Sequence, residues 1–475
     1  MTVTHTYTDN VSLAPRGATL SDSVTQLIPG IAVATSGPRL RFNARYAPEF
    51  LYYQKLDPQE TVFHRGHATG TLELAQDLFF VEAGAQVDQY EISLRGPIYG
   101  GSNINVAGNR ATTRTSYLNP YLVHEFGSGA RAEARLRLST MRADDPAIAD
   151  NDAGRVNLRL ESGPAPTRLL WDLAYESETI DYEAGQESRS QGFTAGGRLR
   201  IIPTVGLLAR AGEERYESAI AGSEVKGSLW SVGFEWTPTS RTRLAATAGK
   251  RFDDDAYTLE FRHRTRLTAW NVAYSEDVTS ARSELFLPGT GDTAGALDAL
   301  FSNRYPDPVE RQKAVQEFIA RTGLPASLAA PVNFFSQQLF LQKRWIALAG
   351  IQGVRNTLAA SAFSETRQIL FSSLGIPASG DFAFSETIRL SGGGVSWGWR
   401  ITPRLAWNLS LSYTRNEFLD TGQTDDYYTT RAGITRHFRP HLSGSLSYRR
   451  QKRAAAEELN SYVENAYIAA LQMNF

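Results

Sequence analysis

Hydrophobic and polar residues alternate with a period of two along most of the chain from Arg39 onward. Residues 407–413 carry Trp, Leu, Leu and Tyr at every second position with Asn or Ser between them, and residues 442–448 follow the same pattern. This period places successive side chains on opposite faces of a strand. The alternating segments reach about ten residues, the length that a tilted strand needs to cross a bilayer, whereas ordinary strands average about five or six. The pattern predicts an all-β fold, a transmembrane antiparallel up-and-down β-barrel.

Short turns and longer polar connections follow these segments in alternation, as in bacterial outer-membrane barrels. The short turns include those marked by Pro203, Pro238, Pro403 and Pro440, where the missing N–H interrupts no ladder. The longer connections include residues 96–110, 144–154 and 371–381. Ten hairpins plus one strand near each end of the chain give about 22 strands, within a range of about 18 to 22. We expect residues 1–475 to form one barrel in the outer membrane.

The last segment of the chain has an outer-membrane signature. Tyr467, Met473 and Phe475 lie on one face of an amphipathic strand that ends in Phe. This ending resembles the signal read by the bacterial outer-membrane insertion machinery, so that machinery and outer-membrane lipid, including lipopolysaccharide, are expected partners. The last strand of a soluble β-protein is the alternative. Trp residues near the Pro turns suit an interfacial aromatic girdle, namely Trp236, Trp397, Trp399 and Trp407.

Residues 285–333 interrupt the β pattern with one long connection on the long-loop side. Pro308 fits the first turn of a short amphipathic helix, which Gly323 and Pro325 end. The apolar side of this helix consists of Val309, Ala314, Val315, Phe318 and Ile319. Loops of this length are usually functional or disordered. We expect a lid or plug of the lumen, and the alternative is a loop that only packs on the rim.

The composition narrows the possible functions. Lys and Arg number 49 against 50 Asp and Glu, so the chain is not a polycation of the nucleic-acid-binding kind. The absence of Cys excludes disulfides, thiolate metal sites and a Cys nucleophile. The chain contains no run of about 18 apolar residues, so no transmembrane helix is predicted. No secretory signal follows Met1, and we expect Met1 to stand where a leader was removed.

The polar strand faces are rich in arginine, and in a membrane barrel those faces line the lumen. The candidate substrate path consists of Arg39, Arg41, Arg45, Arg131, Arg135, Arg137, Arg155, Arg159, Arg198, Arg200, Arg241 and Arg243. Guanidinium groups suit carboxylate, phosphate or sulfate groups on a passing polymer. The alternative is that they pair with inward acids such as Glu133, Glu161 and Glu260 and brace the wall.

The sequence contains only weak signals for a catalytic or metal site, so we expect no enzymatic activity, no cofactor and no metal. His441 and Ser443 have the spacing of an outer-membrane phospholipase pair, but they directly follow the Pro440 turn. His64 and His67 fall on opposite faces of a strand, which suits one metal poorly. The acidic runs 253–255 and 425–426 have the oxygen ligands for a hard cation, but loop solvation also explains them.

Motifs along the whole chain resemble one family. They are residues 6–13 (TYTDNVSL), 27–30 (LIPG), 38–41 (PRLR), 51–53 (LYY), 305–311 (YPDPVER), 322–325 (TGLP) and 353–356 (GVRN). These segments look like the PEP-CTERM system-associated outer-membrane protein family, a group of β-barrel porins linked to exopolysaccharide and exosortase loci. The resemblance implies polymer secretion and no catalytic motif.

We therefore expect a porin for exopolysaccharide export, with polysaccharide and a periplasmic polysaccharide-export complex as partners. A conduit of this kind needs weak contacts at many points, because the polymer must also be released. Two alternatives stay open: a general diffusion porin, and a structural or surface-anchoring barrel of a polysaccharide or PEP-CTERM locus.

Overall fold

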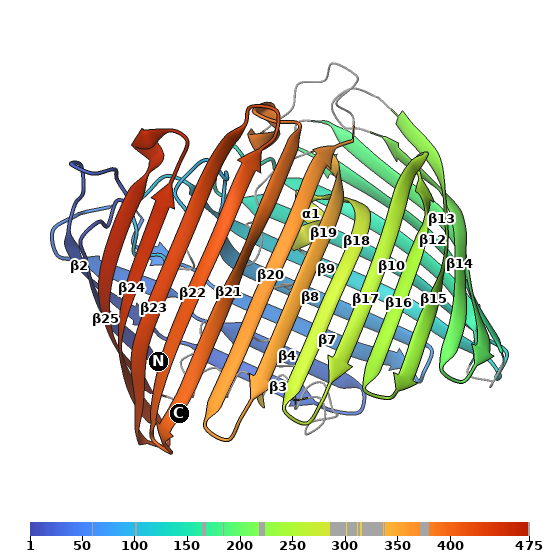
Figure 1. The fold of residues 1–475 in the computed structure, drawn as a ribbon, viewed down its shortest axis with the longest axis horizontal. Coiled ribbons are helices and arrows are strands. Elements are labelled where there is room, and N and C mark those ends of the chain that lie inside the picture. Colours follow the sequence, from blue (N-terminus) through green and yellow to red (C-terminus); the bar gives the residue numbers. More distant parts are fainter. Residues whose placement is uncertain are drawn as a thin grey trace.

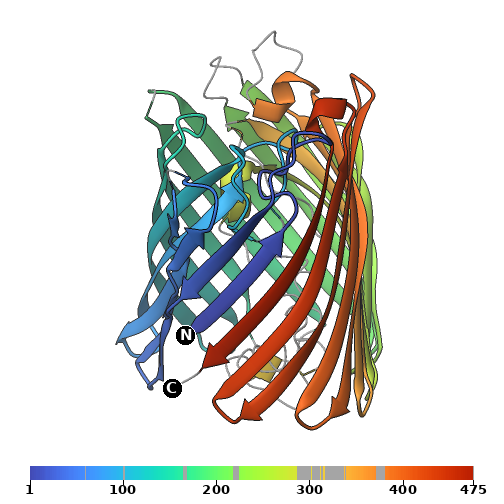
Figure 2. The ribbon, with the colours of Figure 1, turned by 90° about the vertical axis from the view of Figure 1, so that its left-hand side faces the viewer.

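Antiparallel pairing continues around the whole circumference of the computed structural model, which is a closed barrel (Figures 1 and 2). The structure describes residues 1–58, 60–99, 102–163, 168–183, 185–217, 224–285, 301, 311, 314–315, 336, 338–370 and 380–473. Each strand pairs with its neighbours in the wall, and β1 (Thr2–Thr8) closes the barrel on β25 (Tyr462–Met473). The predicted all-β, up-and-down barrel is confirmed.

The wall runs in chain order. Its first part contains β2 (Asp22–Ile28), β3 (Ile31–Ser36), β4 (Leu40–Tyr46), β5 (Glu49–Tyr53), β6 (Val62–Phe63), β7 (Gly66–Ala75), β8 (Phe79–Glu91), β9 (Arg110–Phe126), β10 (Ala130–Ala143), β11 (Asn151–Ser162), β12 (Leu169–Tyr182) and β13 (Glu187–Ile202). Its second part contains β14 (Val205–Glu217), β15 (Glu224–Thr239), β16 (Thr242–Arg251), β17 (Asp254–Arg264), β18 (Thr268–Ser280), β19 (Leu339–Gln352), β20 (Asn356–Ile369), β21 (Thr387–Thr402), β22 (Leu405–Phe418), β23 (Gln423–Arg439) and β24 (Leu442–Ala454). The short helices whose bounds lie within the described ranges are α1 (Ala281–Leu285), η2 (Gly380–Ala383) and η3 (Glu458–Asn460).

Three wall strands are interrupted, which sets the size of the barrel. Pro29 and Gly30 separate β2 from β3, and Pro48 lies between β4 and β5, where a residue without an N–H breaks the ladder. A similar break separates β6 from β7. The 25 described segments therefore form 22 wall strands, as the hairpin count predicted.

Short turns gather at one rim and longer connections at the other. All ten predicted hairpins are present at the short-turn rim, and β1 begins and β25 ends near the same rim (Figure 1). The Met1 ammonium donates to the Met473 carbonyl oxygen at 2.8 Å. In bacterial barrels the short turns are periplasmic, so the longer connections are extracellular.

Apolar side chains cover the outside of the barrel. Leu118, Leu158 and Phe234 are exposed on the outer face, as the predicted contact with hydrocarbon requires. The outward side chains of Trp236 and Trp399 lie within a few residues of short turns. On the C-terminal strand, Tyr467, Leu471 and Met473 also face outward, whereas Phe475 lies outside the described residues.

The long connection after β18 begins with α1, a short helix that the sequence pattern did not predict. Of the proposed lid helix, Ala314 and Val315 are helical and Val315 is buried. Val309, Phe318 and Ile319 lie outside the described residues, so the lid remains a prediction. Among the described residues, no helix has the length and apolar character needed to cross a membrane.

Candidate functional site

The alternation of side chains places most of the candidate arginines on the inner face of the barrel. Leu136 and Leu138 of β10 point outward, so Arg135 and Arg137 point inward. The same argument turns the following candidates inward: Arg41 and Arg45 on β4, Arg131 on β10, Arg155 and Arg159 on β11, Arg198 and Arg200 on β13, and Arg243 on β16. The predicted position on a strand face is wrong for Arg39 and Arg241, because these residues lie in the turns before β4 and β16.

One part of the inner surface, the solvated wall, is formed by the inner faces of β10 to β17. Its charged side chains are accessible to water: Arg159, Arg210 and Arg262 are 57%, 52% and 64% exposed. These residues come from β11, β14 and β17, and all three lie in the half of the wall nearer the short-turn rim. The wall is therefore a hydrated surface in the lumen.

Most charges on the solvated wall are paired across neighbouring strands. Arg155 binds Glu178 at 2.7 Å, and Glu235 accepts ion pairs from Arg198 at 2.7 Å and Arg243 at 2.9 Å. Further pairs join Arg131 to Glu133 and Glu161, Arg135 to Glu133 and Glu82, Arg159 to Glu161, Arg210 to Asp172, and Arg243 and Arg262 to Glu260. The acids proposed as bracing partners, Glu133, Glu161 and Glu260, are thus all paired. Contact of these arginines with a substrate stays a prediction.

An aromatic cluster lies beside the solvated wall, in the half of the lumen nearer the short turns. Phe80 and Tyr121 stack with ring centroids 5.0 Å apart. The guanidinium of Arg135 lies 4.1 Å from the Tyr121 ring centre, and that of Arg137 lies 4.3 Å from the Tyr117 ring centre. The Tyr117 hydroxyl donates to Glu82 at 2.9 Å. Flat aromatic faces therefore lie next to hydrogen-bonding groups.

The opposite part of the inner surface, the packed wall, is formed by the inner faces of β19 to β25 and is buried. Arg449 and Glu464 pair at 2.9 Å with side chains 1% and 0% exposed, and Arg453 pairs with Asp425 at 2.7 Å. Arg367 contacts Glu365 and also pairs with Glu284 of α1 at 2.9 Å. Apolar side chains complete this wall, including Phe340, Phe363 and Leu390.

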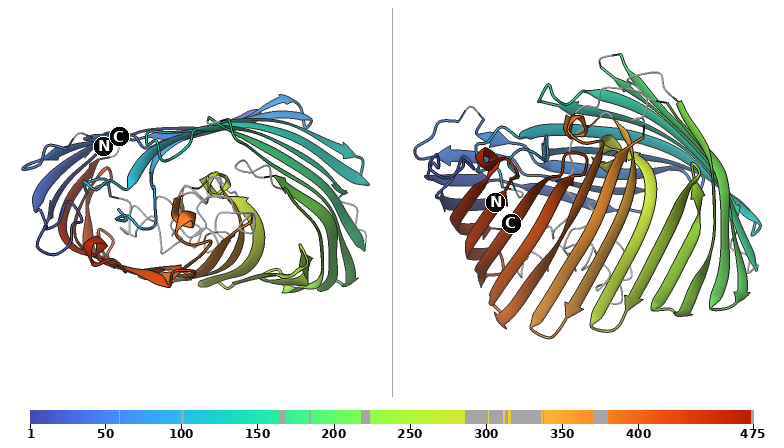
Figure 3. Two further views of the ribbon diagram at one scale, coloured as in Figure 1. Left: turned by 90° about the horizontal axis from the view of Figure 1, so that it is seen from above. Right: turned by 45° about the horizontal axis from the view of Figure 1, so that its top comes forward.

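The connection between β8 and β9 folds into the barrel and packs against this wall. Seen from above, this connection lies inside the ring of strands together with η2 and α1 (Figure 3). The Tyr427 hydroxyl donates to the Leu94 carbonyl at 3.0 Å, and the Tyr462 hydroxyl donates to the Ile98 carbonyl at 3.0 Å. Arg453 donates to the carbonyl oxygens of residues 95 and 96. We call the described residues 92–99 and 102–109 the inner loop.

Asp381 of η2 fastens the start of the inner loop. Its carboxylate accepts a hydrogen bond from the Ser93 hydroxyl, and another from the Leu94 backbone N–H at 2.7 Å. Burial raises the pKa of Asp381 above its ordinary value, although these hydrogen bonds oppose the shift. Asp381 therefore connects two long-loop segments that are far apart in the sequence.

Helix α1 supplies another lumen contact that the sequence analysis missed. Arg282 is buried and donates to the Asn151 side chain and to the Ser139 hydroxyl, the latter at 2.8 Å. It also lies 3.7 Å from Glu178. Arg282 thereby connects the end of β18 to the top of the solvated wall, and nothing in the local sequence marks it.

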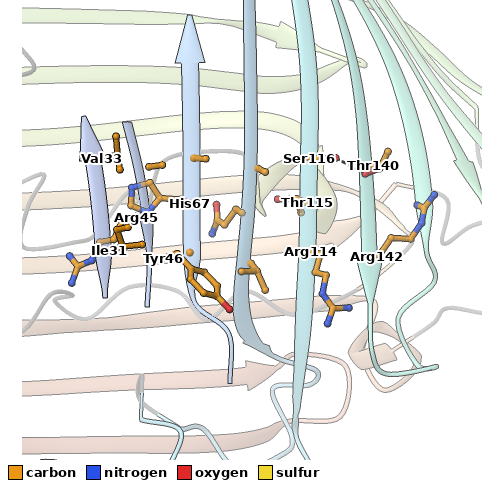
Figure 4. Close-up of a pocket in the computed structure, with 16 residues that line it drawn as sticks. Ile31, Val33, Arg45, Tyr46, His67, Arg114, Thr115, Ser116, Thr140 and Arg142 are labelled. Atoms are coloured by element: carbon orange, nitrogen blue, oxygen red, sulfur yellow. Dashed lines mark hydrogen bonds between the residues drawn. The ribbon is translucent and has the colours of Figure 1, made fainter. Parts of the chain in front are cut away.

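A separate depression of about 600 Å³ lies on the outer face across β3, β4 and β7 to β10 (Figure 4). Its wall has small side chains, such as Ala44, Ala68 and Ala85, between larger groups such as Tyr46 and Arg114. Cross-strand pairing aligns Ala44, Ala68 and Ala85 on the face of the exposed Leu40 and Leu72. The depression therefore faces the membrane and does not belong to the lumen.

The candidate catalytic and metal residues do not assemble into a site. His441 lies in the β23–β24 turn, whereas Ser443 lies on β24 opposite His437. His64 lies between β6 and β7 and shares a 2.6 Å hydrogen bond with the Tyr46 hydroxyl. Within the described ranges, no group of three His, Asp or Glu side chains has a metal-binding arrangement.

Comparison with solved structures supports the fold. The apoprotein of the FrpB iron transporter of Neisseria meningitidis (F5-1 variant) matches with a TM-score of 0.51 at 10% identity, over 100% of this chain and 80% of that one. The F3-3 variant gives a TM-score of 0.50 at 10% identity, over 100% and 81% of the two chains. A further structure of the F5-1 variant gives a TM-score of 0.50 at 9% identity, over 100% of this chain and 82% of that one. This chain is an outer-membrane β-barrel. No protein-family model and no curated protein matches its sequence.

Proposed function

We propose that this barrel is a porin through which an exopolysaccharide leaves the cell. The solvated wall carries the proposal, because it offers hydrated charges on several neighbouring strands of the lumen, with the aromatic cluster beside them. A long polymer in a conduit needs many contacts that are each weak enough to break. Water-exposed ion pairs such as Arg159–Glu161 meet this requirement, since exposed pairs contribute only about 0–1 kcal/mol.

The aromatic cluster supports a carbohydrate as cargo. Phe80, Tyr117 and Tyr121 present flat apolar faces to the lumen beside the charged groups of Glu82 and Arg135. Sugars carry hydroxyl groups around apolar C–H surfaces, so a wall of this mixed kind suits them. The resemblance of the chain to PEP-CTERM system-associated barrels supports the same cargo, and a periplasmic polysaccharide-export complex is the proposed donor.

The packed wall favours a selective conduit over a general diffusion porin. A barrel of 22 strands has a wide lumen, but the inner loop, η2 and α1 occupy part of its cross-section (Figure 3). The buried Arg367–Glu284 pair fixes α1, and hydrogen bonds from Arg453 and to Asp381 fix the inner loop and η2. A lumen narrowed in this way suits an extended chain better than the free diffusion of small solutes.

The test is secretion by the native host after deletion of the chain and complementation with variants. Deletion is expected to lower the polysaccharide in the medium, and the variant Phe80→Ala/Tyr117→Ala/Tyr121→Ala is expected to restore it only partly. The matched control is the outward variant Leu118→Ala/Leu122→Ala, which leaves the lumen unchanged. Normal secretion after deletion would overturn the proposal, and slower uptake of small solutes in that strain would favour a general diffusion porin.

A further inference from the structure

Arginine is concentrated at the short-turn rim, along six successive turns from β13–β14 to β23–β24. We call this segment of the rim the basic arc, and it comprises each turn with three residues on either side. The basic arc contains no Asp, Glu or Lys. Its arginines are Arg200, Arg241, Arg243, Arg262, Arg264, Arg266, Arg355, Arg400, Arg404 and Arg439. The three turns from β7–β8 to β11–β12 differ, because they have acids nearby, namely Asp77, Glu125 and Glu161.

Most of this charge is not neutralised by acids of the described residues. The following arginines are exposed and form no ion pair with an acid of the described ranges: Arg200, Arg241, Arg266, Arg355, Arg400, Arg404 and Arg439. Slightly deeper in the lumen the situation changes, because Arg243 and Arg262 share Glu260 at 3.7 and 2.6 Å. The positive charge is therefore uncompensated at the mouth and paired above it.

The spacing of the turns lets their fields combine. Neighbouring turns are two strands apart, which is about 10 Å along the rim. This distance is comparable to the Debye length of about 8 Å at physiological ionic strength, so the potentials of adjacent turns overlap. A mouth lined by one sign of charge concentrates ions of the opposite sign and accelerates their association.

Two positions indicate that the ligand comes to the mouth and not to the surrounding membrane. Arg200 alternates with the outward Leu199 and Ile201, and Arg400 follows the outward Trp399. Both arginines therefore start from the inner face of the barrel. Lipid headgroups would contact the outer face, where apolar side chains such as Ile201, Trp236 and Phe438 lie near these turns.

We infer that the basic arc captures an anionic polymer at the periplasmic mouth, so that the exported polysaccharide carries carboxylate, sulfate or phosphate groups. This inference rests on the proposed function and adds the charge of the cargo. Guanidinium groups bind such anions with paired, charge-assisted hydrogen bonds. Beyond the mouth, the paired charges of the solvated wall hold the polymer less strongly, which allows it to advance.

The experiment uses the full chain in planar bilayers, with dextran sulfate or neutral dextran of equal length added on the short-turn side. Dextran sulfate is expected to interrupt the current at nanomolar to micromolar concentration, with a rate that falls as salt increases. The variant Arg241→Gln/Arg266→Gln/Arg355→Gln/Arg404→Gln is expected to lower that rate about tenfold or more. All four residues lie in turns, outside the strands.

The matched control also removes four exposed arginines, but at the long-loop ends of strands: Arg189→Gln/Arg215→Gln/Arg389→Gln/Arg415→Gln. Dextran sulfate is expected to interrupt the current through this control at the same rate as through the wild type. Equal interruption by both dextrans, or no change in the turn variant, would overturn the inference and leave the conduit intact. Loss of co-purified anionic phospholipid without a change in block would also overturn it, in favour of lipid binding. If neither dextran sulfate nor neutral dextran interrupts the current through the wild type, no polymer enters the lumen and the proposed function itself is wrong.

Discussion

The buried pair of Arg449 and Glu464 allows a sharp test of the packed wall. Glu464 of β25 accepts two contacts from Arg449 of β24, at 2.9 and 3.0 Å. It also accepts hydrogen bonds from the Thr8 hydroxyl of β1 at 2.8 Å and from the Asn105 amide of the inner loop at 3.0 Å. One carboxylate thus connects the closing strands of the barrel to the inner loop.

We expect Glu464→Gln to destabilise the barrel by about 3–5 kcal/mol, because it leaves a buried guanidinium without its counter-ion. The register adds to this cost, since Arg431 lies directly across from Arg449 and the two cations would face each other alone. A loss of this size changes the equilibrium constant of unfolding by about two to three and a half powers of ten, at 1.4 kcal/mol per tenfold.

The assay is urea unfolding in detergent micelles, followed by the heat-dependent gel mobility of the folded barrel and by Trp fluorescence. The matched control is Glu417→Gln, which breaks the outward Arg389–Glu417 pair of 3.4 Å with an expected loss below about 1 kcal/mol. The double variant Arg449→Met/Glu464→Met is expected to be more stable than Glu464→Gln, because it leaves one buried cation, Arg431, without a counter-ion and not two. If Glu464→Gln and Glu417→Gln lost equal stability, the assignment of a buried, dry network would be wrong.

Three further predictions concern the long loops and the wall. Burial raises the pKa of Asp381, so the folded state binds a proton more tightly than the unfolded state. The free energy of unfolding therefore falls as pH rises from the ordinary pKa of an aspartate through the raised pKa of the folded state. The variant Asp381→Asn should abolish this fall in pH-dependent urea titrations. The Ser385 hydroxyl donates to Asp420 at 2.9 Å and lowers the pKa of that carboxyl group. Asp420 therefore contributes stability that is present at neutral pH and is lost as pH falls towards the lowered pKa. The variant Asp420→Asn should remove this acid dependence in the same titration. A Cβ at Gly233 would overlap the Ala246 carbonyl oxygen across β15 and β16, so Gly233→Ala should lower the folded yield in the gel-mobility assay, whereas Gly197→Ala, with open space around it, should not.

The barrel itself could be predicted because the bilayer imposes a simple rule on every strand. Outward positions in the bilayer must be apolar, so alternation alone identified the strand faces, and the ten short connections, several of them marked by Pro, set the strand count. The inward direction of Arg135 and Arg155 follows from the same rule. The prediction was wrong for Arg39 and Arg241 because each lies in a turn, one residue before a strand begins, where alternation no longer fixes a direction.

The contents of the lumen could not be predicted in this way. Ser93 and Asp381 are 288 positions apart, and Arg282 meets Asn151 across 131 positions, so no local pattern records either contact. The pairing of Arg198 with Glu235 likewise depends on the register of β13, β14 and β15. Sequence patterns indicated which residues face inward, whereas strand register and loop packing determined their partners.

Hydration decides what the same Arg–Glu chemistry does on the two sides of the lumen. On the packed wall, breaking a pair such as Arg449–Glu464 would leave a charge in a dry environment, so the pair holds the inner loop in place. On the solvated wall, water replaces a lost partner of Arg159 or Arg210 at small cost, so under the proposed function these arginines would exchange their carboxylates for groups on the polymer. A conduit needs both properties, a fixed obstruction that sets its width and a wall whose contacts exchange easily. If the barrel is the proposed conduit, its packed and solvated sides supply these two properties with one pair of residue types.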